Sequence, residues 1–296
     1  MTTVLEVRDI QKSFGKTEVL RGVSFSIERG EIFGFLGRNG AGKSTLIHIL
    51  TGVKYPTSGS FQILGLPIEE AKRHIGVFPD IDQFYNEWTA MQHLTFFAKL
   101  QKIPCSKAEL EALLRQVGLQ NEMKKKVKQY SFGMKKKLGV AQALIGQPDF
   151  IILDEPTSGL DPESAIHMRQ LIHQMAANCQ TVFVTSHNLN ELEKMSDRIA
   201  ILKEGHISNI GTMEQLRNVS NYAIEIHIML DRTPEEAFLQ TLTTRYEVND
   251  TNVTLFLQKK EDVAECIRAL VFANYAIYKV TQKEQTLEEI FLQTES

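Results

Sequence analysis

The sequence has few cysteines and no long apolar run. Its three cysteines, Cys105, Cys179 and Cys266, are far apart and lack Cys-x-x-Cys spacing. This excludes a disulfide framework or a cysteine zinc site and indicates a reducing compartment. No apolar run approaches the roughly 18 residues of a transmembrane helix, and the N-terminus alternates like a strand instead of resembling a signal peptide. We therefore expect a cytoplasmic protein without a membrane span of its own.

Net charge is also almost absent. The 296 residues hold 33 Lys and Arg against 36 Asp and Glu, a formal net charge of −3, and 43% of them are hydrophobic. Such a composition is typical of a globular protein and argues against nucleic acid as the main partner. The length predicts about two domains.

Glycine is missing from the last part of the chain. None of the 18 glycines follows Gly211. The charge changes at the same point, since residues 1–212 hold 25 basic and 22 acidic residues and residues 213–296 hold 8 and 14. With a linker-like run at 218–221, we predict a first domain at 1–212 and a small α+β domain at 213–296, to which no chemistry is assigned.

In the first domain, predicted strands alternate with predicted helices. Short apolar runs at 31–36, 150–153, 181–185 and 198–202 are typical of buried strands, and helical periodicity follows at 43–50 and after Asp161-Pro162. Residues 86–147 are predicted to be helical. This order predicts an α/β fold with a parallel sheet that is interrupted by a helical insertion.

A glycine-rich loop stands between the strand at 31–36 and the helix at 43–50. Its residues are Gly37, Arg38, Asn39, Gly40, Ala41, Gly42, Lys43, Ser44 and Thr45. They match the phosphate-binding pattern G-x-x-x-x-G-K-[ST] in the strand-to-helix context that it requires. The loop amides would converge on phosphate oxygens, Lys43 would reach the β- and γ-phosphates, and the Ser44 hydroxyl would bind Mg²⁺. We predict nucleotide binding here.

Two carboxylates end the apolar run at 150–153. Asp154 is suited to the Mg²⁺ of a bound nucleotide, and Glu155 is suited to orient or deprotonate an attacking water. The guanine-reading pattern Asn-Lys-x-Asp does not occur in the sequence, which disfavours a GTPase. The pair therefore predicts nucleotide hydrolysis.

Further short motifs follow in a fixed order. They are Ser-Phe-Gly with Phe14, Tyr130-Ser131-Phe132-Gly133-Met134, Ser158-Gly159-Leu160-Asp161 and Thr185-Ser186-His187. Together with the two sites above, they make residues 1–212 resemble the ATP-binding cassette family, the nucleotide-binding subunits of ABC transporters. The resemblance implies a P-loop NTPase cassette with a mixed or parallel sheet, an antiparallel β subdomain and a helical signature subdomain.

The resemblance also implies roles for these motifs. Phe14 would stack on adenine, and Ser131 and Gly133 would bind the γ-phosphate of ATP held by a second subunit. His187 would contact the γ-phosphate, and Asp161 would couple the two sites. The cofactors would be ATP and Mg²⁺, and two subunits would enclose two ATP molecules.

Two positions depart from the family pattern. Asp80 stands where the family usually has glutamine, and a carboxylate there would be a further Mg²⁺ ligand beside the γ-phosphate. Phe132 replaces the first signature glycine, a variant that resembles the bacterial drug- and antibiotic-exporter branch. The neighbouring lysine runs at 124–128 and 135–137 would attract ATP or acidic headgroups, or would form a solvated helical face, which we favour.

A transport ATPase without its own span requires a separate membrane permease. The resemblance implies that the permease docks after residue 80, where the single tryptophan, Trp88, is a candidate anchor or an ordinary core residue. We expect an exporter ATPase that dimerises on ATP, as a homodimer or with another cassette, at the inner face of the membrane. The alternatives are a non-transport cassette ATPase acting in translation or DNA maintenance, and a regulatory module with weak hydrolysis.

Overall fold

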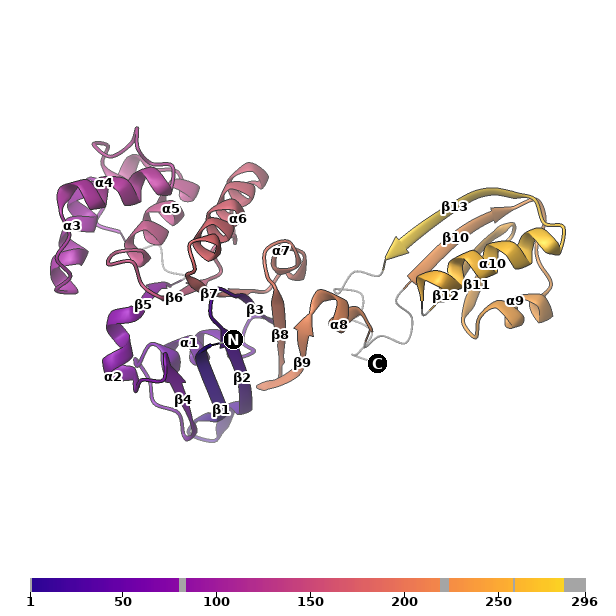
Figure 1. Ribbon diagram of the computed structural model, residues 1–296, viewed down its shortest axis with the longest axis horizontal. Coiled ribbons are helices and arrows are strands. Elements are labelled where there is room, and N and C mark those ends of the chain that lie inside the picture. Colours follow the sequence, from indigo (N-terminus) through magenta and orange to yellow (C-terminus); the bar gives the residue numbers. More distant parts are fainter. Residues whose placement is uncertain (1, 80–83, 219–223, 258, 285–296) are drawn as a thin grey trace. The chain divides into compact units, whose positions relative to one another are not determined.

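The structure is a computed structural model that describes residues 2–79, 84–218, 224–257 and 259–284. The chain divides into two units, Met1–Thr212 and Met213–Ser296 (Figure 1). Each unit is described here by itself. Within the described residues, no helix combines the length and the apolar character needed to cross a membrane.

A six-stranded sheet lies at the centre of the first unit. Its order is β5 (Ile75–Phe78), β6 (Phe150–Asp154), β7 (Thr181–Ser186), β3 (Ile32–Gly37), β8 (Arg198–Lys203) and β9 (His206–Thr212). All neighbours pair in parallel except β8 and β9. Every residue of β3, β6 and β7 is buried, which explains why their sequences are continuous apolar runs instead of alternating patterns.

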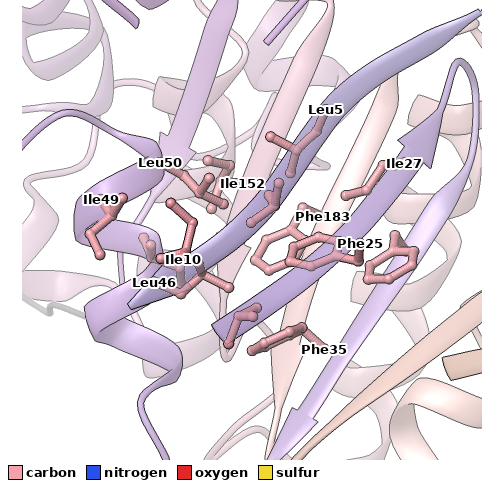
Figure 2. Packing of buried hydrophobic residues seen from close by; sticks show 14 of the residues in the cluster. Leu5, Ile10, Phe25, Ile27, Phe35, Leu46, Ile49, Leu50, Ile152 and Phe183 are labelled. Carbon is pink, nitrogen blue, oxygen red and sulfur yellow. The ribbon is translucent and has the colours of Figure 1, made fainter. Parts of the chain in front are cut away.

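A second, antiparallel sheet covers part of this core. It consists of β2 (Thr17–Glu28), β1 (Thr3–Phe14) and β4 (Ser58–Ile63). Phe25 of β2 contacts Phe33, Phe35 and Phe183 of the larger sheet, with ring centroids 5.2 to 6.1 Å apart. Figure 2 shows Phe25, Phe35 and Phe183 in one cluster with Leu46, Ile49 and Leu50 of α1 (Lys43–Leu50). The helix that carries the glycine-rich loop is thus fixed to the core.

The helical part of the first unit is formed by α3 (Ala90–Leu100), α4 (Lys107–Gln116), η2 (Val127–Gln129) and α5 (Phe132–Ala143). These helices gather apart from β1, β2 and β4 (Figure 1). Capping boxes at Thr89 and Ser106 begin α3 and α4. The remaining helices of the first unit are α2 (Ile68–Ala71), η1 (Lys72–His74), α6 (Pro162–Ala177) and α7 (Leu189–Glu193).

The second unit has a four-stranded antiparallel sheet. Its order is β11 (Tyr246–Asn249), β12 (Asn252–Leu257), β10 (Ile224–Leu230) and β13 (Ile277–Glu284), with helices α8 (Met213–Asn218), α9 (Glu236–Leu242) and α10 (Lys260–Phe272). Leu239 of α9 and Leu270 of α10 pack in one cluster with alternate residues of β10 and β12. Both helices therefore cover one face of the sheet.

The α/β fold with its helical insertion is as the sequence predicts. The sequence does not predict strand β9, because alternate residues of this strand are exposed and its sequence lacks an apolar run. Of the predicted linker at 218–221, Asn218 ends helix α8, and residues 219–221 lie outside the described residues. A helix that the sequence pattern predicts at 287–293 also lies outside them.

Candidate functional site

Some of the predicted site residues, the glycine-rich loop with Asp154, Glu155 and His187, lie at one edge of the six-stranded sheet. Strand β7 lies between β6 and β3, and the three are parallel. The glycine-rich loop follows β3, Asp154 ends β6, and His187 follows β7. Ligands in such folds bind at the carboxyl ends of the strands.

A cavity of about 210 Å³ opens at this edge. It is lined by Val19, Arg38, Asn39, Gly40, Gly42, Lys43, Ser44, Thr45, Asp154 and Glu155. Of the predicted loop residues, Gly37 and Ala41 complete the loop without lining the cavity. Gly40 and Gly42 have φ angles of +84° and +113°, a region that favours glycine. The loop amides at the start of α1 give this cavity the character of an anion site.

Lys43 is buried at the base of the loop. Its Nζ donates to the carbonyl oxygen of Gly37 at 2.6 Å and lies 3.3 Å from Glu155 Oε1. Holding the ammonium in this way offsets the cost of burying it. The lysine therefore stands between the loop backbone and the carboxylate at the end of β6.

Glu155 connects three elements of the site. Its Oε2 lies 2.9 Å from His187 Nδ1, and its other oxygen faces Lys43. Its φ of +49° is in the left-handed region, which is rare for a residue other than glycine and is a strain often found at functional sites. The carboxylate is buried and is aimed between the histidine and the lysine.

Thr185 holds the two adjacent acids and was given no role by the sequence. Its Oγ1 donates to Asp154 Oδ1 at 2.5 Å and accepts from the Glu155 N–H at 3.1 Å. In the sequence, the indication of a role for Thr185 is its position in the Thr-Ser-His motif. The threonine therefore holds the Asp154 carboxylate and the Glu155 backbone.

Oxygen donors from two elements face the cavity. Ser44 and Asp154 both line it, and a hydroxyl with a carboxylate is the donor set that Mg²⁺ prefers beside phosphates. These residues fit the predicted ion. Among the described residues, no cluster of three or more His, Cys, Asp or Glu side chains offers an all-protein metal site. Asp80, the third predicted ligand, lies outside the described residues.

The signature segment begins helix α5 away from this cavity. Ser131 is the N-cap, and its Oγ accepts from the Met134 N–H at 3.3 Å. Neither Ser131 nor Gly133 lines the 210 Å³ cavity. Phe132 is 41% exposed, and its ring lies against Gly159, where a Cβ would come within 3.0 Å of Cε1. Phe132, the bulky residue that departs from the family pattern, thus contacts the Ser-Gly-Leu-Asp segment of the same chain.

Asp161 is the N-cap of α6 and accepts from the Ser164 N–H at 3.0 Å. This hydrogen bond holds the pKa of the Asp161 carboxyl below its usual value. Residues 157–160 line a second cavity of about 490 Å³, which His187 also borders. Asp161 itself is not among the residues that line either cavity.

Phe14 ends strand β1 and is 44% exposed. Lys54 Nζ and Lys12 Nζ lie 4.7 and 5.3 Å from its ring centroid, at cation–π distances. The ring does not line the 210 Å³ cavity.

The prediction that the lysine runs form a solvated helical face is wrong for Lys136. Its side chain is 2% exposed, and its Nζ donates to the Glu155 carbonyl oxygen at 2.6 Å. Lys135 and Lys137 on either side are only half-buried. Because successive side chains point in different directions around a helix, the middle lysine of the run lies on the buried side of α5.

Three aromatic side chains of the helical part form a partly exposed patch, which consists of Tyr85, Trp88 and Phe96. Tyr85 and Trp88 stack with centroids 4.1 Å apart, and Phe96 meets Trp88 edge-on at 5.1 Å. Tyr85 is 47% exposed. Clusters of this kind, with their faces partly in solvent, are typical of interaction surfaces.

Comparison with known sequences agrees with this geometry. Residues 20–158 match the family model described as ABC transporter. The chain is 33% identical to the bacitracin transport ATP-binding protein BcrA of Bacillus licheniformis, over 99% of this chain and 97% of that protein. It is 32% identical to the linearmycin resistance ATP-binding protein LnrL of Bacillus subtilis, over 98% and 97%. The Nod factor export ATP-binding protein I of Rhizobium meliloti is 31% identical, over 98% and 88%.

Solved structures give the same fold. An ATP-binding subunit of an ABC transporter superposes with a TM-score of 0.65 at 30% identity, covering 73% of this chain and 92% of that chain. The ADP conformation of an ATP-binding cassette from another ABC transporter gives 0.67 at 24% identity, covering 73% and 93%. These matches confirm the cassette fold predicted for the chain.

Proposed function

The chain belongs to the ABC transporter family of ATP-binding proteins, whose members are ATPases coupled to transport, and from that premise we propose that it powers an exporter through a separate permease. The observation that carries the proposal is the convergence of Lys43, Glu155 and His187 beside the glycine-rich cavity. The named relatives, which transport bacitracin, confer linearmycin resistance and export Nod factor, support an exporter. They do not support the alternative of a translation or DNA-maintenance ATPase.

In this proposal the loop residues bind the phosphates of ATP. The backbone amides from Gly37 to Ser44 and the Lys43 ammonium neutralise phosphate charge. Ser44 and Asp154 would hold Mg²⁺, which neutralises charge on the β- and γ-phosphates when bound. Lys43 then turns from Glu155 to the phosphates, because the two anions compete for one ammonium.

Glu155 acts on the attacking water. Thr185 holds the strained Glu155 backbone by accepting from its N–H, and the Glu155 carboxylate lies against His187 and Lys43, so that it can orient the water and accept its proton. His187 keeps Glu155 directed at the reacting centre and contacts the γ-phosphate. Phe14 stacks on adenine, and Lys12 and Lys54 hold the Phe14 ring in place at the end of β1.

The second half of each site comes from a partner cassette. Ser131, Gly133 and the N-terminus of α5 form an anion site that does not border the chain's own glycine-rich cavity. We place the γ-phosphate of the partner's ATP there, with Asp161 coupling the two sites. A second copy of this chain is the simplest partner.

Glu155→Gln tests this proposal. The amide cannot accept a proton, so we expect ATP hydrolysis to fall by about 10²-fold or more while ATP still binds. The unhydrolysed ATP should trap a dimer, measured by light scattering after gel filtration with Mg-ATP. A monomer at saturating Mg-ATP would contradict the proposal.

Ser131→Asp in the Glu155→Gln chain separates folding from binding. Aspartate caps a helix as well as serine does, but its charge opposes the phosphate, so the dimer should be lost while thermal unfolding is unchanged. Ser106→Asp, at the N-cap of α4, is the matched control and should still dimerise.

We further propose that the aromatic patch of Tyr85, Trp88 and Phe96 docks the permease at the inner face of the membrane. Trp88→Ala removes the central ring of the patch, and such anchors carry about 2 kcal/mol or more of binding energy. We expect the variant to lose co-purification with the permease from solubilised membranes. Tyr278→Ala, an exposed tyrosine of the second unit, should retain it; equal recovery of both variants would contradict docking at this patch.

A further inference from the structure

The middle lysine of the Lys135-Lys136-Lys137 run has surroundings that are unusual for a charged side chain. Lys136 is 2% exposed, although it belongs to a cluster of three consecutive lysines. A buried ammonium is costly unless hydrogen bonds compensate it. Its Nζ donates to the Glu155 carbonyl oxygen at 2.6 Å and lies 5.3 Å from the centroid of the Phe132 ring.

The hydrogen bond from Lys136 is accepted by Glu155, a residue whose backbone is strained. Glu155 has a φ of +49°, and that backbone determines where its carboxylate points. Thr185 Oγ1 holds the Glu155 N–H, and Lys136 Nζ holds the Glu155 C=O. The Ser158 N–H also donates to this carbonyl, at the longer distance of 3.2 Å. Side chains from two separate elements therefore fix both sides of one residue.

The lysine also connects this residue to the signature helix. Lys136 lies in the second turn of α5, which begins at Ser131. One turn earlier, Phe132 packs on Gly159, and Phe78 at the end of β5 faces the same ammonium at 5.9 Å. A movement of the N-terminus of α5 would therefore shift Lys136 and, through its hydrogen bond, the peptide group that determines where the Glu155 carboxylate points.

We propose that Lys136 is a positioning residue that holds the Glu155 backbone in its left-handed conformation and so transmits the placement of the signature helix to the carboxylate. This inference rests on the proposed ATPase function. Lys136 acts through Glu155, and it is not among the residues that line either cavity. Its loss should therefore slow hydrolysis while leaving ATP binding unchanged.

The test compares Lys136→Met with the wild type and with Lys135→Met and Lys137→Met, which remove the same charge from the same helix. Rates are normalised to ATP-binding sites counted by fluorescent-nucleotide titration, so that unfolded protein does not contribute. We expect kcat to fall about 10- to 100-fold for Lys136→Met, the cost typical of a misplaced catalytic group, with the ATP Kd and KM within threefold. The two control variants should keep kcat within twofold.

Lys136→Arg keeps a long cationic donor and should recover at least half of the loss on a logarithmic scale. Should Lys136→Met fail to fold, Lys136→Gln replaces it, with an expected fall of at least threefold at unchanged Kd. A kcat within twofold of the wild type, or a loss matched by an equal loss of ATP affinity, would overturn the inference.

Glu155→Gln is assayed in parallel to separate the two proposals. If Glu155→Gln abolishes hydrolysis and the Lys136 variants do not slow it, only the positioning role is wrong. If Glu155→Gln hydrolyses ATP at the wild-type rate, the proposed function fails and the positioning role fails with it.

Discussion

At the scale of single residues, the glycine-rich loop depends on two glycines that differ in their surroundings. Gly40 and Gly42 both have positive φ angles. A Cβ on Gly40 would meet nothing within 4 Å, whereas one on Gly42 would lie 2.8 Å from Leu20 Cδ2 and 3.2 Å from the Val19 carbonyl oxygen. Of these two glycines, Gly42 is therefore the one that lies close against β2.

Gly42→Ala and Gly40→Ala should separate backbone strain from crowding. A left-handed alanine costs about 1–2 kcal/mol, so Gly40→Ala should lower the free energy of unfolding by that amount. Gly42→Ala adds the clash with β2 and should lower it by clearly more, with loss of ATP binding. Urea unfolding and nucleotide titration measure the two effects, and equal stabilities would contradict this account.

The sequence predicted the residues that meet at the cavity because their positions follow from local rules. The glycine-rich loop, Asp154 and His187 each come after an apolar run, and parallel strands bring their carboxyl ends to one edge. Lys43 and Asp154 line the cavity there, and His187 contacts Glu155 beside it. Lys136 could not be predicted in this way. Its burial depends on which side of α5 faces Glu155, and a lysine run by itself indicates a surface.

At the scale of elements, helix α3 carries a buried histidine among aromatic rings. His93 is 1% exposed, its Nε2 lies 2.8 Å from Gln142 Oε1 of α5, and the ring of Phe97 is 4.7 Å away. Nδ1 has no hydrogen-bond partner among the described residues. Burial lowers the pKa of His93 below its usual value.

This histidine should make the helical part sensitive to acid. Below pH of about 6.5, the unfolded chain binds a proton at His93 that the folded chain excludes, so stability falls as the pH falls, by at most about 1.4 kcal/mol per pH unit. His93→Gln should therefore reduce the loss of stability between pH 7.5 and 5.5, measured by urea unfolding. His167→Gln, an exposed histidine of α6, should leave the loss unchanged; the same slope in all three proteins would contradict this role.

Helices with strong local patterns were predictable. Asp161-Pro162 begins α6, as the sequence predicts. The Ser106 capping box at the start of α4 and the Ser131 N-cap of α5 are local patterns of the same kind. Strand β9 was not predictable, because it is an edge strand whose alternate residues are exposed and its pairing with β8 is a tertiary contact.

At the scale of the whole molecule, the two units have separate cores. The cluster around Phe33 and Phe183 is built from residues between Val4 and Leu202, and the cluster around Ile226 is built from residues between Ile224 and Leu270. No residue belongs to both clusters. Each unit therefore buries its own apolar surface.

A chain that ends at Thr212 should fold and bind ATP with an affinity within threefold of the full chain, because its core is complete. We propose that the second unit makes an intersubunit or regulatory contact, so in the shortened chain ATP-dependent dimerisation or the basal ATPase rate should change by more than twofold. Gel filtration and a phosphate-release assay measure both. If neither changes, the second unit has no such role.

The contact between Phe132 and Gly159 has a consequence for the evolution of this chain. The ring occupies the space that a side chain at position 159 would need, and the φ of +71° at Gly159 strains any other residue there. Replacing Phe132 by glycine would remove the ring but would leave the positive φ, so it would not by itself open position 159 to substitution. Position 159 should therefore remain glycine across the exporter branch, whether or not position 132 is aromatic.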